Sequence, residues 1–489
     1  MTANNLKRRG GGRSNRASRK MSASIEQLEF SPPYNTDNFV EPLNIEGIEA
    51  IDNAAMDVLE QIGIEFLNDE AISVLKDAGC NIKEGSKNVR MDRSWVKEMI
   101  KKAPTEFTIT PRNPDKKIKI GGRNIAFVNV SSPPNVMDLD RGRRVGDHES
   151  FKDLIKLTQY FNCIHLAGGY PVEPVDIHAS IRHLECLYDK FTLTDKVCHA
   201  YSLGSERVED VIEMARIASG LDEKEFFSTP RIYTNINSSS PLKHDWPMLD
   251  GAMRFAKKSQ PVIVTPFTLA GAMAPVTMTG AVVQSIAEGL AAIALLQYIN
   301  PGTPCVLGTF TSNVDMKSGA PAFGTPEYIR ATQMTGQMAR YYGLPLRASN
   351  ACAANAPDSQ STWETMNSMW ANVNSGVNVV YHSAGWLEGG LIASYEKFVI
   401  DCEILQQFQR YFDPKIVDVS NSSLAFDAIK EVGPNGHFFG SDHTQSRYND
   451  AFYSPFLSDW RNYEAWLDTG GEWTHERANK TWKKILNEF

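Results

Sequence analysis

The sequence predicts an α/β protein: a TIM (β/α)8 barrel with an α+β N-terminal extension and a helical C-terminal cap. Between residues 124 and 412, short β-rich runs alternate strictly with segments of helical periodicity, which indicates a parallel sheet with helical crossovers. The eight runs and eight helical segments match a closed eight-stranded barrel in number and size. The alternative is an open doubly wound sheet, but no G-x-G-x-x-G follows the first run.

The composition of residues 1–29 predicts a disordered basic leader. This stretch is rich in Gly, Ser and Asn, lacks an apolar period, and contains no acid before residue 26. Its basic residues are Lys7, Arg8, Arg9, Arg13, Arg16, Arg19 and Lys20. It is either a solvated tail or a handle for an acidic partner protein or RNA. No apolar stretch follows it, so it is neither a secretory signal peptide nor a twin-arginine signal.

The pattern of residues 30–123 predicts an α+β extension before the barrel. Apolar residues recur at helical spacing over 45–66, and residues 69–78 predict a second helix with Asp69 as a possible N-cap. A strand-rich patch follows, with FTIT (107–110), KIKI (117–120) and NIAFVNV (124–130).

The barrel occupies residues 124–412. Its expected strands are 125–131, 164–169, 197–203, 231–237, 261–267, 304–310, 344–350 and 377–383. Its expected helices are 147–161, 177–190, 206–219, 246–258, 276–298, 326–342, 359–375 and 395–412.

Residues 413–489 are rich in aromatic and charged residues, and they predict a helical cap or a contact in a homo-oligomer. The residues concerned are His437, Phe438, Phe439, Phe452, Tyr453, Phe456, Trp460, Tyr463, Trp466 and Trp473.

The composition is that of a globular, cytoplasmic protein. Net charge is −8, so we expect no global attraction to nucleic acid or to acidic membranes. The longest apolar segment, 280–296, contains Gln284 and Glu288, and we expect a buried helix there and no membrane span. The cysteines number seven, an odd count, and form no C-x-x-C pair, which favours a reducing compartment.

In a barrel of this kind the active site lies at the carboxyl ends of the strands. The residues expected there are mostly aromatic or neutral and polar: Asn129, Ser131, Gly168, Gly169, Tyr170, Tyr201, Asn235, Asn237, Ser238, Phe267, Phe310, Arg347, Asn350, Tyr381, His382, Trp386 and Glu388. The sequence lacks a phosphate loop, H-E-x-x-H and G-x-S-x-G. Cys305 and Cys352 lie apart from any His pair, so no bound metal is predicted, and Cys198 and His199 are interpreted as core and rim residues.

A set of aromatic rings with few carboxylates suits a cation that cannot donate hydrogen bonds, namely a quaternary ammonium. Each ring face attracts such a cation by about 0.5–2 kcal/mol. The cluster Tyr381, His382 and Trp386 is the main candidate. The alternative interpretation is that these rings are ordinary packing of the barrel interior and rim.

Two loops are informative. GAMAPVTMTG (271–280) leads into a very apolar helix, where backbone amides favour an anionic group. TSNVDMKSGAPAFGTPE (311–327) is long enough to be a lid or binding loop.

Five segments resemble the trimethylamine methyltransferase family: AGAMAPVTMTGAVVQSIAEGLA (270–291), SNVDMKSGAPAFGTPEY (312–328), residues 350–364, HSAGWLEGGL (382–391) and GHFFGSDHT (436–444). The Arg/Gly-rich leader also resembles leaders of bacterial members. The resemblance covers nearly the whole chain. It implies a TIM-barrel enzyme that demethylates an amine and docks a separate small corrinoid protein, whose cob(I)alamin accepts the methyl group.

The sequence departs from the family's archaeal trimethylamine enzymes in one respect. Those enzymes carry pyrrolysine after strand seven, whereas RASNACAANAPDSQ (347–360) contains only ordinary residues. Members without pyrrolysine are similar to enzymes that use quaternary amines such as glycine betaine. A quaternary amine leaves as a neutral tertiary amine, so its displacement needs no general acid. The corrinoid supplies the nucleophile, and the protein supplies orientation and desolvation.

The candidate roles follow from this interpretation. Tyr381, His382, Trp386 and Phe310 would hold the ammonium head, whereas Arg347 and the amides near Gly271 would hold a carboxylate, unless Arg347 is a structural ion-pair partner. Asn235, Asn237 and Asn350 are further binding candidates, and His437 and His443 either reach the mouth or pack within the cap. The candidate catalytic residues are His382 and Glu388, of which Glu388 would orient His382, balance the cation or cap the next helix.

The predicted function is methyl transfer from a glycine betaine-like quaternary amine to the Co(I) corrinoid of a partner protein. One alternative is a trimethylamine or other methylamine:corrinoid methyltransferase. Another is a betaine-binding protein without catalysis.

Overall fold

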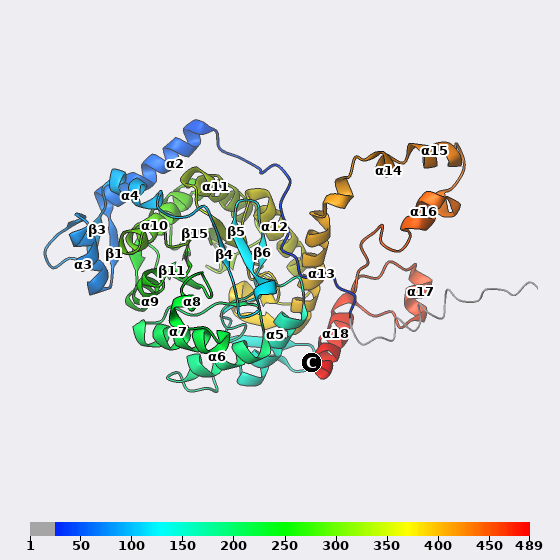
Figure 1. Cartoon of the computed structure of the whole chain (residues 1–489), viewed down its shortest axis with the longest axis horizontal. Coiled ribbons are helices and arrows are strands. Elements are labelled where there is room, and N and C mark those ends of the chain that lie inside the picture. The colour runs from blue at the N-terminus through cyan, green and yellow to red at the C-terminus, as the bar shows by residue number, and fades with distance from the viewer. Residues whose placement is uncertain (1–24) are drawn as a thin grey trace, which may run out of the picture.

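The structure is a computed structural model that describes residues 25–489. The basic residues of the expected leader, 7–20, lie outside the described residues. Figure 1 shows a body in which helices surround the strands, and a C-terminal segment that reaches away from this body.

The centre of the body is a parallel sheet of six strands in the order β11-β13-β15-β18-β19-β6. These are β6 (Ala126–Phe127), β11 (Thr234–Ser238), β13 (Val262–Pro266), β15 (Cys305–Gly308), β18 (Leu346–Ser349) and β19 (Val379–Tyr381). A second parallel pair joins β9 (Leu166–Ala167) to β10 (Val197–Cys198). Single parallel bridges link this pair to the six-stranded sheet, Val128 with Leu166 and His199 with Tyr233. The prediction of an α/β fold with a parallel sheet is confirmed.

Helices connect successive strands. They are α5 (His148–Tyr160), α6 (Arg182–Leu193), α7 (Ser205–Ser219), α8 (Glu223–Phe226), α9 (Trp246–Lys257), α10 (Met278–Ile299), α11 (Pro326–Tyr342), α12 (Ser359–Ser375) and α13 (Tyr395–Tyr411). Apart from the short α8, each of them overlaps one of the eight expected helical segments. Short strands in the connections are β12 (Lys243–His244), β14 (Leu269–Ala270), β16 (Ser312–Val314) and β17 (Pro321–Ala322).

The parallel strands contribute alternate residues to one apolar cluster. It contains Ala126, Val128, Leu166, Val197, Tyr233, Ile263, Val306, Val379 and Tyr381. The hairpin of β4 (Glu106–Ile109) and β5 (Ile118–Gly121) adds Ile109, Ile118 and Ile120 to this cluster. Thr110, just after β4, donates to the carbonyl of Pro230, which precedes β11. The hairpin therefore closes the cluster at the amino ends of the strands, and the carboxyl ends are left for a site.

The N-terminal extension packs against α10 through α2 (Ile45–Asp57) and α4 (Arg93–Ile100). The helix expected over 45–66 is too long: α2 continues as a π-helical turn, Val58–Ile62, and ends before Gly63, whose φ is +88°. Residues Ile64–Phe66 instead form β1, which pairs with β12 and with β3 (Asn88–Arg90), itself paired with β2 (Asn81–Ile82). The expected cap Asp69 is also wrong. Asn68 caps α3 (Asp69–Asp77), because its side chain accepts from the amide of Ala71.

By length and composition alone, α10 is the one helix of the described part of the chain that could cross a membrane. Of its apolar window, 78 % is buried inside the protein. The helix contacts β13 as well as α2 and α4, and its Glu288 accepts hydrogen bonds from Ser238 and Ser240. This is the environment of a core helix.

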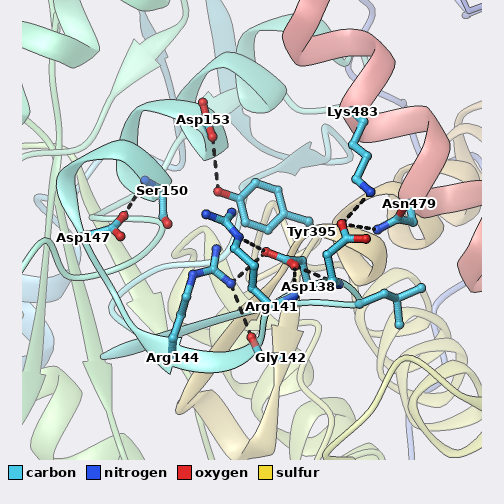
Figure 2. Close-up of polar contacts among 12 residues, drawn as sticks. Asp138, Arg141, Gly142, Arg144, Asp147, Ser150, Asp153, Tyr395, Asn479 and Lys483 are labelled. Atoms are coloured by element: carbon cyan, nitrogen blue, oxygen red, sulfur yellow. Dashed lines mark hydrogen bonds and ion pairs between the residues drawn. The ribbon is translucent and has the colours of Figure 1, made fainter.

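The last helix, α18 (Thr474–Glu488), packs against α13 and α5. Figure 2 shows Asn479 and Lys483 of α18 beside the hairpin of β7 (Asn135–Asp138) and β8 (Gly142–Val145). The buried Asp138 pairs there with Arg141 at 3.1 Å and Arg144 at 2.7 Å. β7 in turn pairs with β21 (Ile392–Ser394), which pairs with β20 (Trp386–Leu387). The C-terminal helix is thus anchored to the segment that follows the first parallel strand.

Residues 413–473, which we call the arm, extend from the body in Figure 1. The arm carries only short helices: α14 (Asn421–Leu424), α15 (Phe426–Val432), α16 (Asp442–Arg447) and α17 (Tyr463–Asp468). Many of its apolar side chains are exposed, with Phe452 at 89 % and Val417 at 79 %. The aromatic residues expected to pack as a cap are therefore largely on the surface.

Two lysines are buried close to the strand ends. Lys196 is 2 % exposed, and its Nζ donates to the carbonyls of Thr158 and Phe161 at 2.6 and 2.7 Å, at the end of α5. Burial, with a smaller contribution from Lys116, lowers the pKa of Lys196 to about 7. Lys190 donates to the carbonyls of Gly168 and His199, and burial lowers its pKa to about 8.

We predict that Lys196 makes stability rise with pH. Between about pH 7 and pH 10 the unfolded chain keeps the lysine proton that the folded chain has lost, because an unperturbed lysine titrates near 10.4. The free energy of unfolding of the wild type, relative to Lys196→Met, should then rise by up to about 1.4 kcal/mol per pH unit in that range. Urea unfolding at several pH values measures this difference. Lys317→Met, at an exposed lysine, is the control. A difference for Lys196→Met that does not change with pH would contradict the assignment.

Candidate functional site

A cavity of about 420 Å³ lies at the carboxyl ends of the parallel strands. It is lined by Ser131, Ser132, Gly169, Tyr170, Glu173, His199, Tyr201, Leu203, Asn235, Asn237, Met248, Phe267, Phe310, Arg347, Tyr381, His382, Trp386, Gly389 and Gly390. Many of these residues lie two or four positions beyond an apolar interior residue of the same strand. Tyr233, for example, is followed on the same side by Asn235 and Asn237. Because side chains alternate along a strand, the sheet that builds the core also builds the cavity.

Seven of the predicted binding or catalytic residues line this cavity. They are Asn235, Asn237, Phe310, Arg347, Tyr381, His382 and Trp386. The structure brings them together from β11, β15, β18 and β19 and from the segments that directly follow these strands.

Three predicted residues do not line the cavity. Glu388 adopts a φ of +51°, and its carboxylate pairs with Arg143 at 3.0 Å and does not orient His382. Asn350 is buried, and its side chain donates to the carbonyl of Ser383, behind the strand ends. Gly271 lies in a turn with φ +93°, next to Met316. His437 and His443 do not line the cavity either, because both belong to the arm.

The aromatic residues of the cavity contact one another. Phe310 lies 5.0 Å from Phe267 and 5.9 Å from Trp386, measured between ring centroids. Tyr170 and Tyr201 form a second pair, at 4.6 Å. Trp386 is fixed by its indole N–H, which donates to the carbonyl of Cys352 at 3.1 Å. The cavity therefore presents several rigidly held ring faces.

Arg347 places a positive charge among these rings. It lies on β18, in register with Gly308 on one side and Val379 on the other, and is 3 % exposed. Its guanidinium lies 4.5 Å from the ring centroid of Tyr381 and 5.5 Å from that of Phe310. Burial lowers its pKa to about 10, so it stays charged at neutral pH.

The hydrogen bonds of Arg347 are few and long. Nη1 donates to the carbonyl of Thr309 at 3.4 Å, Nη2 lies 3.4 Å from Nε2 of His382, and Nε has no partner among residues 25–489. Within the same residues, no carboxylate is among the groups that perturb its pKa. The structural ion pair considered for Arg347 is therefore not made by the described part of the chain.

Two histidines of the cavity are held by backbone amides. Nδ1 of His382 accepts from the amide of Ser131 at 3.3 Å, and Nε2 of His199 accepts from the amide of Asn235 at 3.1 Å. Burial holds the pKa of both well below the usual range; the charge of Arg347 adds to this for His382, and the charges of Lys190 and Arg347 add to it for His199. Each is therefore neutral, and the remaining nitrogen carries the proton: Nε2 in His382 and Nδ1 in His199.

The one carboxylate that lines the cavity within the described chain is Glu173, which is paired with Arg182. The cavity thus offers rings, hydrogen-bond donors and a cation, and its carboxylate is already neutralised. Such a site can bind, orient and desolvate a ligand. Between residues 25 and 489, no three His, Cys, Asp or Glu side chains form a group able to hold a metal ion.

His199, expected as a core or rim residue, lines the cavity together with Glu173, Leu203 and Met248, for which the sequence predicts no role. The signal for His199 is the alternation Val197, His199, Tyr201, in which Val197 belongs to the interior cluster. Glu173 and Met248 lie on connections, and no strand periodicity reaches them.

The model of the family described as trimethylamine methyltransferase (MTTB) matches residues 8–489. A glycine betaine methyltransferase from Desulfitobacterium hafniense (strain Y51) is 36 % identical over 466 residues, which cover 94 % of each chain. A proline betaine:corrinoid methyltransferase from Eubacterium limosum is 28 % identical, over 82 % of this chain and 83 % of that one. The trimethylamine methyltransferase of Methanosarcina thermophila is 27 % identical, over 90 % of this chain and 92 % of its own.

Among solved structures, the monomethylamine methyltransferase of Methanosarcina barkeri has a TM-score of 0.53 at 11 % sequence identity. The alignment covers 91 % of this chain and 88 % of that one. At this identity the likeness concerns the fold alone.

The half-exposed Gly390 fixes one wall of the cavity, since its φ is +105° and a Cβ there would lie 2.5 Å from Cη2 of Trp386. We predict that Gly390→Ala displaces the Trp386 indole. Gly319→Ala is the matched control, because Gly319 also has a positive φ but nothing within 4 Å of a new Cβ. The control should cost about 1–2 kcal/mol of unfolding free energy from backbone strain alone. Gly390→Ala should cost about 1–3 kcal/mol more from overpacking. Urea unfolding and near-UV circular dichroism measure both effects, and equal losses would show that Gly390 does not position Trp386.

Proposed function

The chain belongs to the trimethylamine methyltransferase family and is a methyltransferase, and we propose that it moves a methyl group from a quaternary amine to the Co(I) corrinoid of a partner protein. The observation that carries the choice of a quaternary amine is the cavity wall formed by Phe267, Phe310 and Trp386. Ring faces attract an ammonium that has no N–H to donate. The carboxylate that lines the cavity, Glu173, is already paired.

The absence of a free acid from the described cavity lining supports the same choice. A quaternary amine departs as a neutral tertiary amine, so its leaving group needs no proton, whereas a methoxy compound or a tertiary amine needs an acid or a metal. His382 and His199 are neutral and deep, and each is fixed by a backbone amide, so their role is to bind and not to transfer protons. The ordinary residues at 347–360 also argue against the chemistry of pyrrolysine.

The mouth of the cavity is the place where we expect the corrinoid of the partner protein to act. Gly389 and Gly390, half-exposed residues of the lining, bring no side chain to the mouth. A corrinoid carried by a small partner protein would supply the nucleophile there. This chain's residues would hold the amine with one methyl group toward the mouth and exclude water around it.

We also propose that the chain is divided into a closed barrel and two flanking segments. The single bridges at Val128 and His199 support a closed (β/α)8 barrel over 124–412, with 30–123 as an extension and 413–489 as a C-terminal segment. All seven cysteines are free thiols, which supports a cytoplasmic location.

We further propose that the arm contacts a second copy of the chain. The body covers few of its apolar side chains, and exposed apolar surface of this extent is typical of interfaces. The most exposed examples are Val417, Val419, Phe426, Phe439, Phe452 and Trp460.

Methyl transfer tests the function directly. Purified protein is mixed with reduced free cob(I)alamin and, in separate reactions, with glycine betaine, proline betaine, carnitine, choline, trimethylamine or dimethylglycine, and the Co(I) spectrum is followed. We expect loss of the Co(I) spectrum with quaternary amines and none with trimethylamine or dimethylglycine. Transfer from trimethylamine alone would contradict the proposal. Betaine binding without transfer, even with the cognate corrinoid protein, would favour a binding protein without catalysis.

The aromatic wall is tested in the same assay. Phe267→Leu keeps an apolar side chain but removes a ring face, so it should raise KM for the amine about 3–10-fold while leaving the fold intact. Phe489→Leu, at a half-exposed phenylalanine outside the cavity, is the control and should change nothing. An unchanged KM in Phe267→Leu would remove this ring from the site.

The arm is tested by the mass of the particle in solution. We expect the wild type to be an oligomer by light scattering, and Val417→Ser, Phe426→Ser and Phe452→Ser combined to lower its mass. Val276→Ser with Met316→Ser replaces exposed apolar residues outside the arm and is the control. A monomeric wild type would contradict the proposal.

A further inference from the structure

Trp386 belongs to the aromatic wall of the cavity, and we propose that Lys397 and Asp401, a buried ion pair on α13, are positioning residues for it. Neither Lys397 nor Asp401 lines the cavity, so both act through the backbone that carries Trp386. The inference goes beyond the proposed function because it assigns roles behind the cavity wall. Only its statement about the affinity for an amine rests on that function.

The turn after β19 has a backbone that must be held in place. His382 has a φ of +57° and Gly385 a φ of +95°, both in the left-handed region. Such a backbone persists at a residue with a Cβ only where surrounding contacts fix it. The turn also lies close to α13, because a Cβ at Gly385 would be 3.1 Å from Cδ2 of Phe398. Trp386 follows directly and begins β20, so the position of Gly385 sets the direction of the indole.

The carboxylate of Asp401 holds this turn. Its Oδ2 accepts from the amide of Gly385 at 2.9 Å, and its Oδ1 pairs with the ammonium of Lys397. Lys397 also donates to the hydroxyl of Thr365 on α12, at 2.7 Å. The side chains of Lys397 and Asp401 are each 1 % exposed. The ion pair therefore ties the turn to two helices at once.

The ion pair is an expensive way to fill this space. Both charges lose their hydration, and apolar residues of similar volume are often as stable in such places. An apolar residue at position 401 would, however, leave the buried amide of Gly385 without its acceptor. The carboxylate thus supplies an acceptor at a fixed place, and Lys397 compensates its charge.

A second contact holds Trp386 from the segment after β18. The indole N–H donates to the carbonyl of Cys352 at 3.1 Å, and the Cys352 thiol donates to the carbonyl of Trp386 at 3.0 Å. Glu364 on α12 accepts from the amides of Ala353 and Ala354, at 2.8 and 3.0 Å. Helices α12 and α13 therefore each supply a carboxylate that fixes one of the two segments in contact with Trp386.

Two double variants isolate the acceptor. Both contain Lys397→Met, one with Asp401→Asn and the other with Asp401→Leu. Neither leaves a buried charge at the pair, and only the first can still accept from the amide of Gly385. In the cob(I)alamin assay with glycine betaine, the variant with Asp401→Asn should keep KM within about 2-fold of the wild type. The variant with Asp401→Leu should raise KM about 5–10-fold and change kcat less, because a displaced ring no longer faces the ammonium.

Glu403 on the same helix provides the matched control. It is 4 % exposed and accepts from the amides of Phe456 and Leu457, both at 3.1 Å, and neither of these residues lines the cavity. Glu403→Leu removes a comparable buried acceptor, so it should lower the free energy of unfolding without raising KM. An equal rise of KM in Glu403→Leu would show that lost stability alone causes the effect, and would overturn the positioning role.

A structural measurement does not depend on the proposed function. In protein with isotope-labelled tryptophan, NMR detects the indole N–H signals, and the signal of Trp386 is the one lost in Trp386→Phe. Its chemical shift should be kept in the variant with Asp401→Asn and should move in the variant with Asp401→Leu. If Asp401→Leu prevents folding, Asp401→Ala takes its place with the same expectations.

Two results would overturn the inference: an unchanged Trp386 signal in both double variants, or the same KM in both. Failure of the proposed function looks different. A wild type that transfers no methyl group would contradict that function, while the indole signals would still decide whether the ion pair positions Trp386.

Discussion

The site depends on one interaction above the others: the burial of the Arg347 guanidinium on an interior position of a parallel sheet. The remaining interior residues at this level of the strands are apolar or neutral, and Tyr381 and Phe310 cover the guanidinium with their ring faces. The sheet can hold the charge there because backbone hydrogen bonds between strands fix β18 on both sides. Burial keeps both histidines neutral, and the charge of Arg347 acts in the same direction on each. Backbone amides decide which nitrogen of each histidine carries the proton.

Because of this buried charge, the two ends of the cavity differ chemically. Hydrogen-bond donors lie at the buried end of the cavity, and aromatic rings lie between them and the mouth. The glycines at the mouth bring no side chain to it. A ligand with opposite charges at its two ends fits these surroundings better than a simple cation does. The protein contributes position and desolvation, and the reactive group comes from a partner, so the chain needs no acid or base of its own. The C-terminal helix, although distant in sequence, stabilises this layout by holding the hairpin that follows the first parallel strand.

Much of the fold was predictable because buried parallel strands and amphipathic helices have clear periods. The period of two also places Asn235, Phe310 and Tyr381 at the cavity, and it would have placed His199 there. This period no longer predicts side-chain directions after the strands end. Glu388 itself has a positive φ, and its side chain faces Arg143. Asn350 similarly turns behind the strand ends. Composition alone left two interpretations of the arm open, a cap or an oligomer contact, because aromatic residues signal burial without saying whether the same chain or another one provides it.

The most direct test is a calorimetric comparison of the affinities for glycine betaine and 3,3-dimethylbutanoate. The second ligand has the same shape and carboxylate but a neutral carbon in place of the ammonium nitrogen. If rings recognise the charge and Arg347 recognises the carboxylate, 3,3-dimethylbutanoate should compete for the same site but bind about 10–100-fold more weakly, because it forgoes the attraction of several ring faces at about 0.5–2 kcal/mol each. Equal affinity would contradict the account, since the rings would then provide only apolar contact. Failure of the two ligands to compete would contradict it as well, because the carboxylate would have no place in the cavity.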